Sequence, residues 1–345
     1  MSWQTENIIG NNYGAENSDM FFLAEAKYHV KISEKSKTKS NDEFVDSDLD
    51  SLIKYNLDHK PFLWNQITTI NPYGLWSQHP SISCVRAKLD LRKEFNSVRD
   101  GNVVDAEENI HCLKIAIQYS WDIHRLCKKL DIPEMRFRNI FYENTKNLDF
   151  LKFSKNIYLP QVPGVSIFAF GDIKKLKHIE DTEVTLRVHD ACLNSDCFRG
   201  TICTCAPYLF WSIQKAVETA QRGGVGLIFY FKKEGRSLGE VIKFRVYSAR
   251  KAQEGGDTSE TYFDKTSEIA GIEDIRFQEL MPDPLLWMGI NKIDHLYSMS
   301  NVKYDALVAA GIKVHHRYDL PKEYISAEAC VEIDAKIKSG YFSST

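Results

Sequence analysis

Apolar positions follow two different spacings along the second half of the chain, and these spacings predict its elements. Short apolar runs at 165–170, 184–188 and 225–231 have the length and composition of strands. A helical spacing starts at Pro207 and ends before the glycine pair at 223–224. The same order of signals continues with a helix over 239–253, a helix end at 285–288, a strand at 293–297, a helix at 304–310 and a strand at 312–316. Alternating strands and helices predict a mixed α/β domain over residues 161–325.

The first half of the chain shows a helical spacing. The apolar residues that carry it recur every three or four positions: Ile110, Leu113, Ile117 and Trp121. A second helix is expected from Pro133 to about Asn144, because proline is favoured at a helix start. The acidic run at 33–51 is expected to be a solvated loop. We therefore expect a mainly helical N-terminal region over residues 1–160 with a loop-rich start, and a C-terminal tail over 326–345.

Length and charge limit the classes of protein and partner. A chain of 345 residues exceeds the usual size of one domain, which predicts two. The formal net charge of −3 argues against a nucleic-acid partner. An anionic ligand would therefore need a local group of basic residues. The sequence contains no run of about 18 apolar residues, so no membrane span is predicted. The first residues lack the pattern of a secretory signal, and we expect a cytoplasmic protein.

Four of the eight cysteines lie within fourteen positions, which in a reducing compartment indicates a metal or catalytic site. Thiolates of Cys192, Cys203 and Cys205 suit zinc, and three protein ligands leave one tetrahedral position for water. Zinc can lower the pKa of such a water to about 7. A structural zinc site would use a fourth protein ligand, so the spacing favours a catalytic Zn²⁺. Core cysteines without a metal are the alternative, and Cys197 is a further possible ligand.

The cysteine spacing resembles that of a known family. C-x10-C-x-C, preceded by Arg187 and His189, is similar to the R-x-H-x-x-C zinc motif of GTP cyclohydrolase II. Further matching motifs follow in the family's order: E-G-R-x-x-G at 234–239, D-T-x-E at 257–260, D-x-R at 274–276 and N-x-K at 301–303. The resemblance implies a zinc-dependent hydrolase that opens a nucleotide ring, with one Zn²⁺ per subunit, a small-molecule nucleotide substrate and a homodimer.

Departures from the family pattern surround the expected ligand site. Asp190 and Ala191 stand where the family has serine and glutamate, and Tyr208 replaces a glutamine. A narrower resemblance, to the cyclohydrolase-II-like proteins of uracil catabolism, accounts for these changes: it covers 202–209, 239–244, 276–283 and 298–305, and more loosely 71–74. It implies hydrolytic opening of the pyrimidine ring of uridine monophosphate (UMP). The alternatives are a GTP cyclohydrolase II of riboflavin synthesis and a non-catalytic nucleotide-binding protein.

Roles for individual residues follow from the motifs. Release of a three-carbon fragment from uracil needs two C–N cleavages, so some group must carry protons between steps. The candidate catalytic residues are His189, Tyr230, Asp274 and Arg276, with Glu240 as a further proton carrier. Arg187 and His189 are two strand positions apart, so both should point to one face. The candidate substrate-binding residues are Arg187, Tyr208, Glu234, Arg236, Glu240, Lys243, Ser300 and Lys303. Lys243 and Arg245 suit a phosphate near a helix start, or an ordinary solvated basic face.

Overall fold

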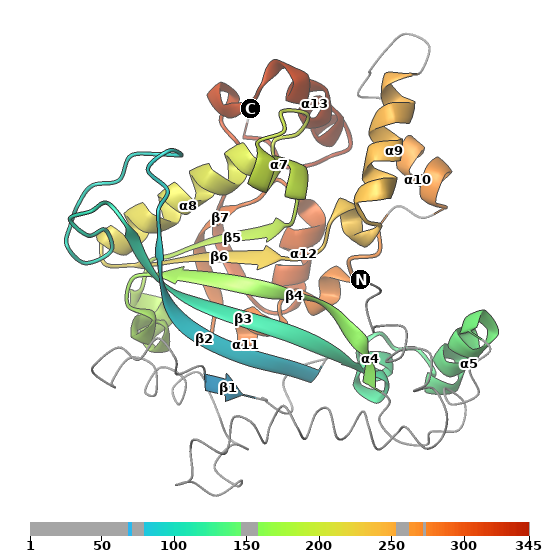
Figure 1. The fold of residues 1–345 in the computed structure, drawn as a ribbon. Coiled ribbons are helices and arrows are strands. Elements are labelled where there is room, and N and C mark those ends of the chain that lie inside the picture. The colour runs from blue at the N-terminus through green and yellow to red at the C-terminus, as the bar shows by residue number, and fades with distance from the viewer. Residues whose placement is uncertain (1–67, 71–78, 146–157, 253–261, 272–273, 345) are drawn as a thin grey trace, which may run out of the picture.

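The fold is built on one eight-stranded sheet (Figure 1). The computed structural model describes residues 68–70, 79–145, 158–252, 262–271 and 274–344. The strands lie in the order β1-β2-β3-β4-β6-β5-β7-β8. Their bounds are β1 Thr68–Ile70, β2 His79–Leu89, β3 Ile110–Asp122, β4 Tyr158–Phe170, β5 Val184–Asp190, β6 Val225–Phe231, β7 Lys292–Tyr297 and β8 Lys313–Tyr318. The mixed α/β class predicted from the sequence is confirmed.

Two kinds of strand pairing meet in this sheet. Pairing is antiparallel from β1 through β2, β3 and β4 to β6. It is parallel from β6 through β5 and β7 to β8. The carboxyl ends of β5, β6 and β7 therefore lie at one edge of the sheet. Ligands of open α/β sheets bind outside such carboxyl ends, which places the expected site at this edge.

Helices cover both faces of the sheet (Figure 1). Along β6 the faces alternate, because Leu227 and Phe229 belong to one buried cluster and Ile228 belongs to another. The first cluster includes Leu285 of α11, and the second is completed by Ile213 of α8. The helices are α4 Ile123–Lys129, α5 Glu134–Thr145, α7 Leu193–Phe198, α8 Cys205–Gln221, α9 Glu240–Lys251, α10 Tyr262–Ala270, α11 Asp283–Trp287, α12 Asn301–Ala309 and α13 Cys330–Lys338.

The helix predicted from residue 110 onward is wrong, because residues 110–122 form β3. Leu113, Ile115 and Ile117 alternate into one cluster, while Ile110 and Cys112 lie in the cluster on the other face. From residue 113 to residue 119, buried residues at odd positions alternate with half-buried residues at even positions, which is the period of a strand and competes with the helical spacing. Its isoleucines favour the strand.

The expectation of a mainly helical N-terminal region is also wrong for the residues that the structure describes. Three strands, β1 to β3, precede the short helices α4 and α5, and β3 pairs with β4 across the predicted boundary at residue 160. The helix expected after Pro133 is confirmed as α5. The predicted loops at 1–20 and 33–51, the segment 71–74 and the D-T-x-E segment lie outside the described residues. The limits of the predicted domains stay a prediction.

Two local features of the fold bear on the site. The tail expected at 326–345 contains α13, a helix that was not predicted from the sequence. α8 lies directly against β6, because a Cβ at Gly226 would stand 2.1 Å from the carbonyl oxygen of Ala216. In the described part of the chain, no helix combines the length and apolar character needed to cross a membrane.

Candidate active site

Three cysteine sulfurs meet just beyond the carboxyl end of β5. Cys192 follows β5, and Cys205 is the first residue of α8, so the strand and the helix bring them together. Cys203 Sγ lies 3.6 Å from Cys192 Sγ, and all three sulfurs lie within 4.8 Å of one another. Hydrogen bonds from Cys192 and Cys205 lower the pKa of Cys203. The predicted cysteine triad is therefore assembled by the fold.

The triad has the chemistry of a zinc site. Three soft sulfur donors at these separations can bind one tetrahedral ion and leave a fourth position. Lys243 of α9 donates a hydrogen bond to Cys192 Sγ at 2.7 Å and pairs with Glu234 at 3.2 Å. Burial opposes the charge of Lys243, but the attraction of Cys205 and Cys192 outweighs it and raises the pKa. A cation against the sulfurs offsets the negative charge of a three-thiolate site.

His189 and Asp196 form a buried network behind the triad. Arg187 Nη2 lies 3.2 Å from His189 Nδ1, which confirms that both side chains share one face of β5. Since an arginine only donates, Nδ1 must accept and Nε2 must carry the ring proton. Nε2 donates to Asp196 Oδ2 at 3.0 Å. The same oxygen accepts from the Cys192 backbone N–H and from the Tyr230 hydroxyl, at 2.9 Å and 2.8 Å.

This network fixes the position of the first metal-site cysteine. Burial opposes ionisation of Asp196, but the hydrogen bond from His189 leads the contacts that hold its pKa below the ordinary value. Burial lowers the pKa of His189, so the imidazole stays neutral. Both of its ring nitrogens are engaged. Through Asp196, His189 and Tyr230 support the position of the Cys192 backbone, and their role as proton carriers stays a prediction.

Asp190, the last residue of β5, binds two cations. Its Oδ2 accepts from Arg276 Nη1 at 2.6 Å and lies 2.9 Å from Lys303 Nζ. Arg276 also donates through Nε to Asp274 at 2.9 Å. Lys303 donates to the Val188 carbonyl at 3.1 Å. Burial alone would raise the pKa of Asp190, but Lys303 and Arg276 outweigh it and hold the pKa below its ordinary value.

Tyr208, which stands where the family pattern has a glutamine, packs against Arg187. The Arg187 guanidinium lies over the Tyr208 ring, 3.8 Å from its centroid. The Tyr208 hydroxyl donates to the Tyr318 carbonyl of β8. Arg187 Nη1 in turn donates to the Tyr297 carbonyl at 2.8 Å. The tyrosine thus holds Arg187 against the end of β7 through stacking, which an amide side chain does not supply.

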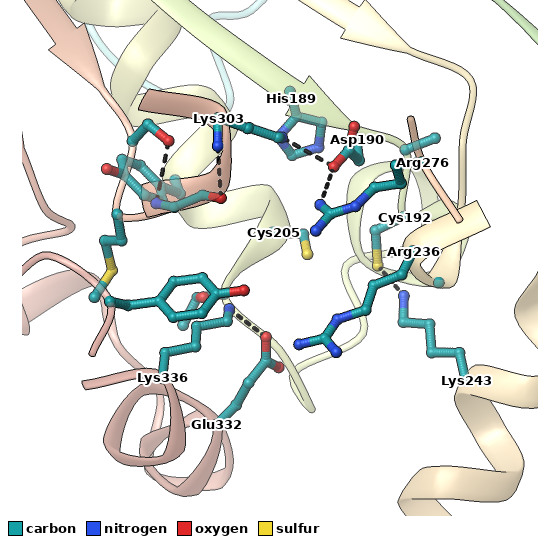
Figure 2. Close-up of a pocket in the computed structure, with 18 of the residues that line it drawn as sticks. His189, Asp190, Cys192, Cys205, Arg236, Lys243, Arg276, Lys303, Glu332 and Lys336 are labelled. Atoms are coloured by element: carbon teal, nitrogen blue, oxygen red, sulfur yellow. Dashed lines mark hydrogen bonds and ion pairs between the residues drawn. The ribbon is translucent and has the colours of Figure 1, made fainter. Parts of the chain in front are cut away.

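One cavity connects these groups (Figure 2). Its volume of about 200 Å³ is far above the roughly 10–15 Å³ that one water needs on the same measure. Cys192 and Cys205 line it. Six basic side chains line it as well, against two acidic ones, and this excess of positive charge suits an anionic ligand. The basic residues are Arg187, Arg236, Lys243, Arg276, Lys303 and Lys336, and the acidic ones are Asp190 and Glu332.

A strained loop aims Arg236 into the cavity (Figure 2). Gly235, Arg236 and Ser237 all have positive φ, at 55°, 58° and 65°. For the two residues with a Cβ, this conformation costs about 1–2 kcal/mol each. Strain of this kind persists where the surroundings determine the backbone. The Arg236 carbonyl accepts from the Ile275 N–H at 3.1 Å, which ties the loop to the D-x-R segment.

The cavity gathers most of the predicted site residues. Those that line it are Arg187, His189, Cys192, Cys205, Tyr208, Arg236, Lys243, Arg276, Ser300 and Lys303. Ser300 also caps α12 by accepting from the Lys303 N–H. Cys203, Tyr230, Glu234 and Asp274 contact these residues or the network behind them, from outside the lining. Glu240 does not line the cavity, and Arg245 is exposed on α9.

The lining residues that the sequence did not predict include Tyr247, Glu332, Lys336 and Tyr341. Tyr247 lies on α9 one turn beyond Lys243, so helical spacing from that lysine could have suggested it. The other three belong to α13 and the segment after it, outside every motif. No local signal in the sequence connects them with the cysteines.

Comparison with known proteins agrees with this geometry. Residues 129–319 match the sequence profile of the GTP cyclohydrolase II family. The chain belongs to the GTP cyclohydrolase II family. Its relatives include the uracil-regulated protein 1 of Schizosaccharomyces pombe, 41% identical over 303 residues, which are 81% of this chain and 68% of that protein. A Lachancea kluyveri protein provisionally named as the GTP cyclohydrolase URC1 is 38% identical over 294 residues, 82% of this chain.

The match to these two relatives is broader than the match to bacterial proteins. GTP cyclohydrolase-2 of Pasteurella multocida is 30% identical over 161 residues, which are 44% of this chain and 68% of that protein. The chain spans only part of each fungal relative, 65% of the Lachancea kluyveri protein and 68% of the Schizosaccharomyces pombe protein. The family profile, over residues 129–319, includes the cysteine triad.

Proposed function

We propose that this chain is a zinc-dependent cyclohydrolase that opens the pyrimidine ring of UMP by hydrolysis. The observation that carries the proposal is one cavity that contains both the cysteine sulfurs and an excess of basic side chains. The sulfurs fit a reactive metal, and the basic residues fit a phosphorylated ligand. The family match supports ring hydrolysis, and the name of the relative from Schizosaccharomyces pombe supports a role related to uracil.

The zinc ion would be held by Cys192, Cys203 and Cys205. When bound, it would supply a Lewis acid and a water of lowered pKa. Residues around the three cysteines would keep the sulfurs in place. Asp196 holds the Cys192 backbone, and Lys243 offsets the charge of the sulfurs. We expect one Zn²⁺ per subunit, and the homodimer stays a prediction.

The charge pattern near Asp190 supports a monophosphate over a triphosphate. Arg276 belongs to the D-x-R motif and Lys303 to the N-x-K motif, and both line the cavity, yet both are bound to Asp190. Each therefore has less positive charge to offer a chain of phosphates. Arg236 and Lys336 line the cavity as further basic groups, and Lys336 is itself paired with Glu332. UMP carries one phosphate, whereas GTP carries three.

The reaction on uracil must break two C–N bonds. At C4, water adds a hydroxyl to the carbonyl carbon and a proton to the departing N3. At C6, water adds a hydroxyl to C6 and a proton to C5, and the hydroxyl proton then moves to N1 as the C6–N1 bond breaks. The C4 carbonyl carbon and the conjugate acceptor C6 are the electrophilic positions. Lys303 has a pKa lowered to about 8 by burial, against the attraction of Asp190, so it is protonated at neutral pH and can hold an anion. Arg276, fixed by Asp190 and Asp274, would orient the ring or its carbonyl oxygens.

A GTP cyclohydrolase II activity is the second candidate, because the family profile and the bacterial relatives favour it. The two functions differ in a direct assay. Zinc-loaded protein is mixed separately with UMP and with GTP, and the ultraviolet band of each base is followed. We expect the uracil band to disappear, the guanine band to persist, and Cys203→Ser to abolish the loss. Change with GTP alone would support the second candidate, and no change with either nucleotide would contradict both.

A further inference from the structure

The C-terminal helix α13 forms one wall of the cavity. Glu332 and Lys336, on one face of this helix, line it together with the later Tyr341. All three lie beyond residue 319, where the match to the family profile ends. In Figure 2, Glu332 and Lys336 lie on the side of the cavity opposite Asp190 and Lys303. A ligand between these two sides would be in reach of both.

Contacts on two sides hold α13 in place. Ile333 packs in a buried cluster with Tyr208 and Tyr297, the two residues that support Arg187. Before the helix, Ser326 Oγ donates to the Thr201 carbonyl at 2.9 Å, and Thr201 itself donates to a glutamate at 328. Thr201 lies in the loop that leads to Cys203. The helix is therefore fixed relative to the cysteine triad rather than loosely attached.

Glu332 is an unusual residue in this wall because its carboxylate is buried and only half satisfied. The residue is 4% exposed. Its Oε1 accepts from Lys336, one turn along the helix. Its Oε2 has no hydrogen-bond partner among the residues that the structure describes. Buried carboxylate oxygens are normally hydrogen-bonded, and an ionised carboxylate can only accept. The side chain therefore suits a ligand group that donates an N–H or O–H.

The donor can be narrowed by charge. A phosphate at neutral pH offers acceptors and a negative charge, both of which a carboxylate disfavours. The remaining donors of a uridine nucleotide are the ribose hydroxyls and the N3–H of the base. We propose that Glu332 is a specificity-determining residue that accepts a hydrogen bond from the nucleoside part of the substrate. This inference rests on the proposed function for the identity of that nucleoside.

Binding of matched ligands tests the inference. Dissociation constants of UMP, 2′-deoxy-UMP and N3-methyl-UMP are measured by calorimetry on zinc-loaded wild-type protein, Glu332→Gln and Asp334→Asn. Asp334 is exposed on the same helix and provides the control. A hydrogen bond to a charged group is worth about 1.5–3 kcal/mol, so we expect Glu332→Gln to weaken UMP about tenfold or more. Wild-type protein should bind one analogue about as weakly, whereas Glu332→Gln, whose neutral amide oxygen is a weaker acceptor, should separate that analogue from UMP less.

Each outcome is decisive. Loss with 2′-deoxy-UMP identifies the ribose hydroxyl as the donor, and loss with N3-methyl-UMP identifies the base. The inference is overturned if wild-type protein separates neither analogue from UMP, or if folded Glu332→Gln separates them equally well. The wild-type arm needs no variant, so misfolding of Glu332→Gln, seen by thermal unfolding, would not hide the answer.

Failure of the proposed function looks different. If UMP binds but its ring stays intact, the proposed reaction is wrong while the analogue comparison still tests Glu332. If UMP does not bind, the proposed substrate is wrong. The same comparison is then made with GTP, 2′-deoxy-GTP and N1-methyl-GTP, and equal binding of all three by wild-type protein would overturn the inference for that nucleotide as well.

Discussion

Asp190 and Arg276 are joined by a 2.6 Å hydrogen bond at the end of β5, and Lys303 lies 2.9 Å from the same carboxylate oxygen. One carboxylate thus offsets part of the positive charge of two basic residues that line the cavity. In the GTP cyclohydrolase II motif, a serine stands where this chain has Asp190. The proposed preference for a ligand with one phosphate rests on this single departure in the sequence.

Replacement of this carboxylate should change the preference among phosphates. In Asp190→Asn, Arg276 and Lys303 regain charge for a ligand, so binding of UTP should strengthen relative to UMP. Interactions with charged groups of about 1.5–3 kcal/mol correspond to a shift of about tenfold or more. Calorimetry with UMP and UTP keeps the base constant and isolates the phosphates. An unchanged ratio in a folded variant would contradict the role given to Asp190.

Loss of one triad sulfur should remove the metal. We expect Cys203→Ser to purify with far less than one zinc per chain, because the two remaining thiolates make a poor site. Cys197→Ser is the matched control, since Cys197 is exposed and outside the triad. Zinc is measured by elemental analysis of both variants and of the wild type. Equal zinc in Cys203→Ser and Cys197→Ser would show that the metal is held elsewhere.

Lys243 should tune the affinity for zinc without being a ligand. Its Nζ contacts the Cys192 sulfur, so Lys243→Gln removes the charge that offsets the thiolates. Loss of groups that support metal ligands typically lowers metal affinity about 10–100-fold, and we expect a loss in this range. Competition with a chromogenic chelator measures it. Arg245→Gln, on the exposed face of the same helix, should retain the wild-type affinity. Equal affinities for both variants would refute the assignment.

Lys303 should make ligand binding depend on pH. Burial lowers its pKa to about 8, so the folded protein loses this positive charge as the pH rises through 8. The affinity for UMP should therefore fall above pH 8. Lys303→Arg keeps its charge and should show a flatter profile over the same range. Titrations of both proteins between pH 7 and pH 9.5 provide the check, and parallel profiles would exclude Lys303 as the cause.

The same lysine should affect stability in the opposite direction. An unfolded lysine titrates near 10.4, so between about pH 8 and that value the unfolded chain binds more protons than the folded one. The contribution of Lys303 to the free energy of unfolding thus rises with pH in this window. Chemical denaturation of Lys303→Met should lack this rise. If the wild type and the variant change alike, the lysine is not buried in the way described.

The sequence predicted the centre of the site better than its walls. Cys192, Cys203 and Cys205 lie in one motif, and the strand period alone placed Arg187 beside His189. β3 satisfies a helical spacing at four apolar positions, but its buried residues alternate from 113 to 119, and this strand period outweighs the helical one. Glu332 could not have been predicted, since it reaches the cavity only through the packing of α13 against a distant tyrosine cluster.

The same limit applies to the roles within the site. The sequence named His189 and Tyr230 as candidate proton carriers, because both residue types can exchange protons. In the structure both donate to Asp196, which holds the Cys192 backbone, and the role of proton carrier stays a prediction. Hydrogen-bond partners across the sheet depend on tertiary packing, which a linear motif does not contain.

The central claim is that this chain hydrolyses the ring of UMP, and the product formed in heavy-oxygen water tests it most directly. Zinc-loaded protein is incubated with UMP in such water, and the products are identified by mass spectrometry. We predict a product that is one water heavier than UMP, or its two fragments, with the heavy oxygen on the carbon that left nitrogen. Unaltered UMP from fully zinc-loaded protein, or heavy oxygen found only in released phosphate, would contradict the account.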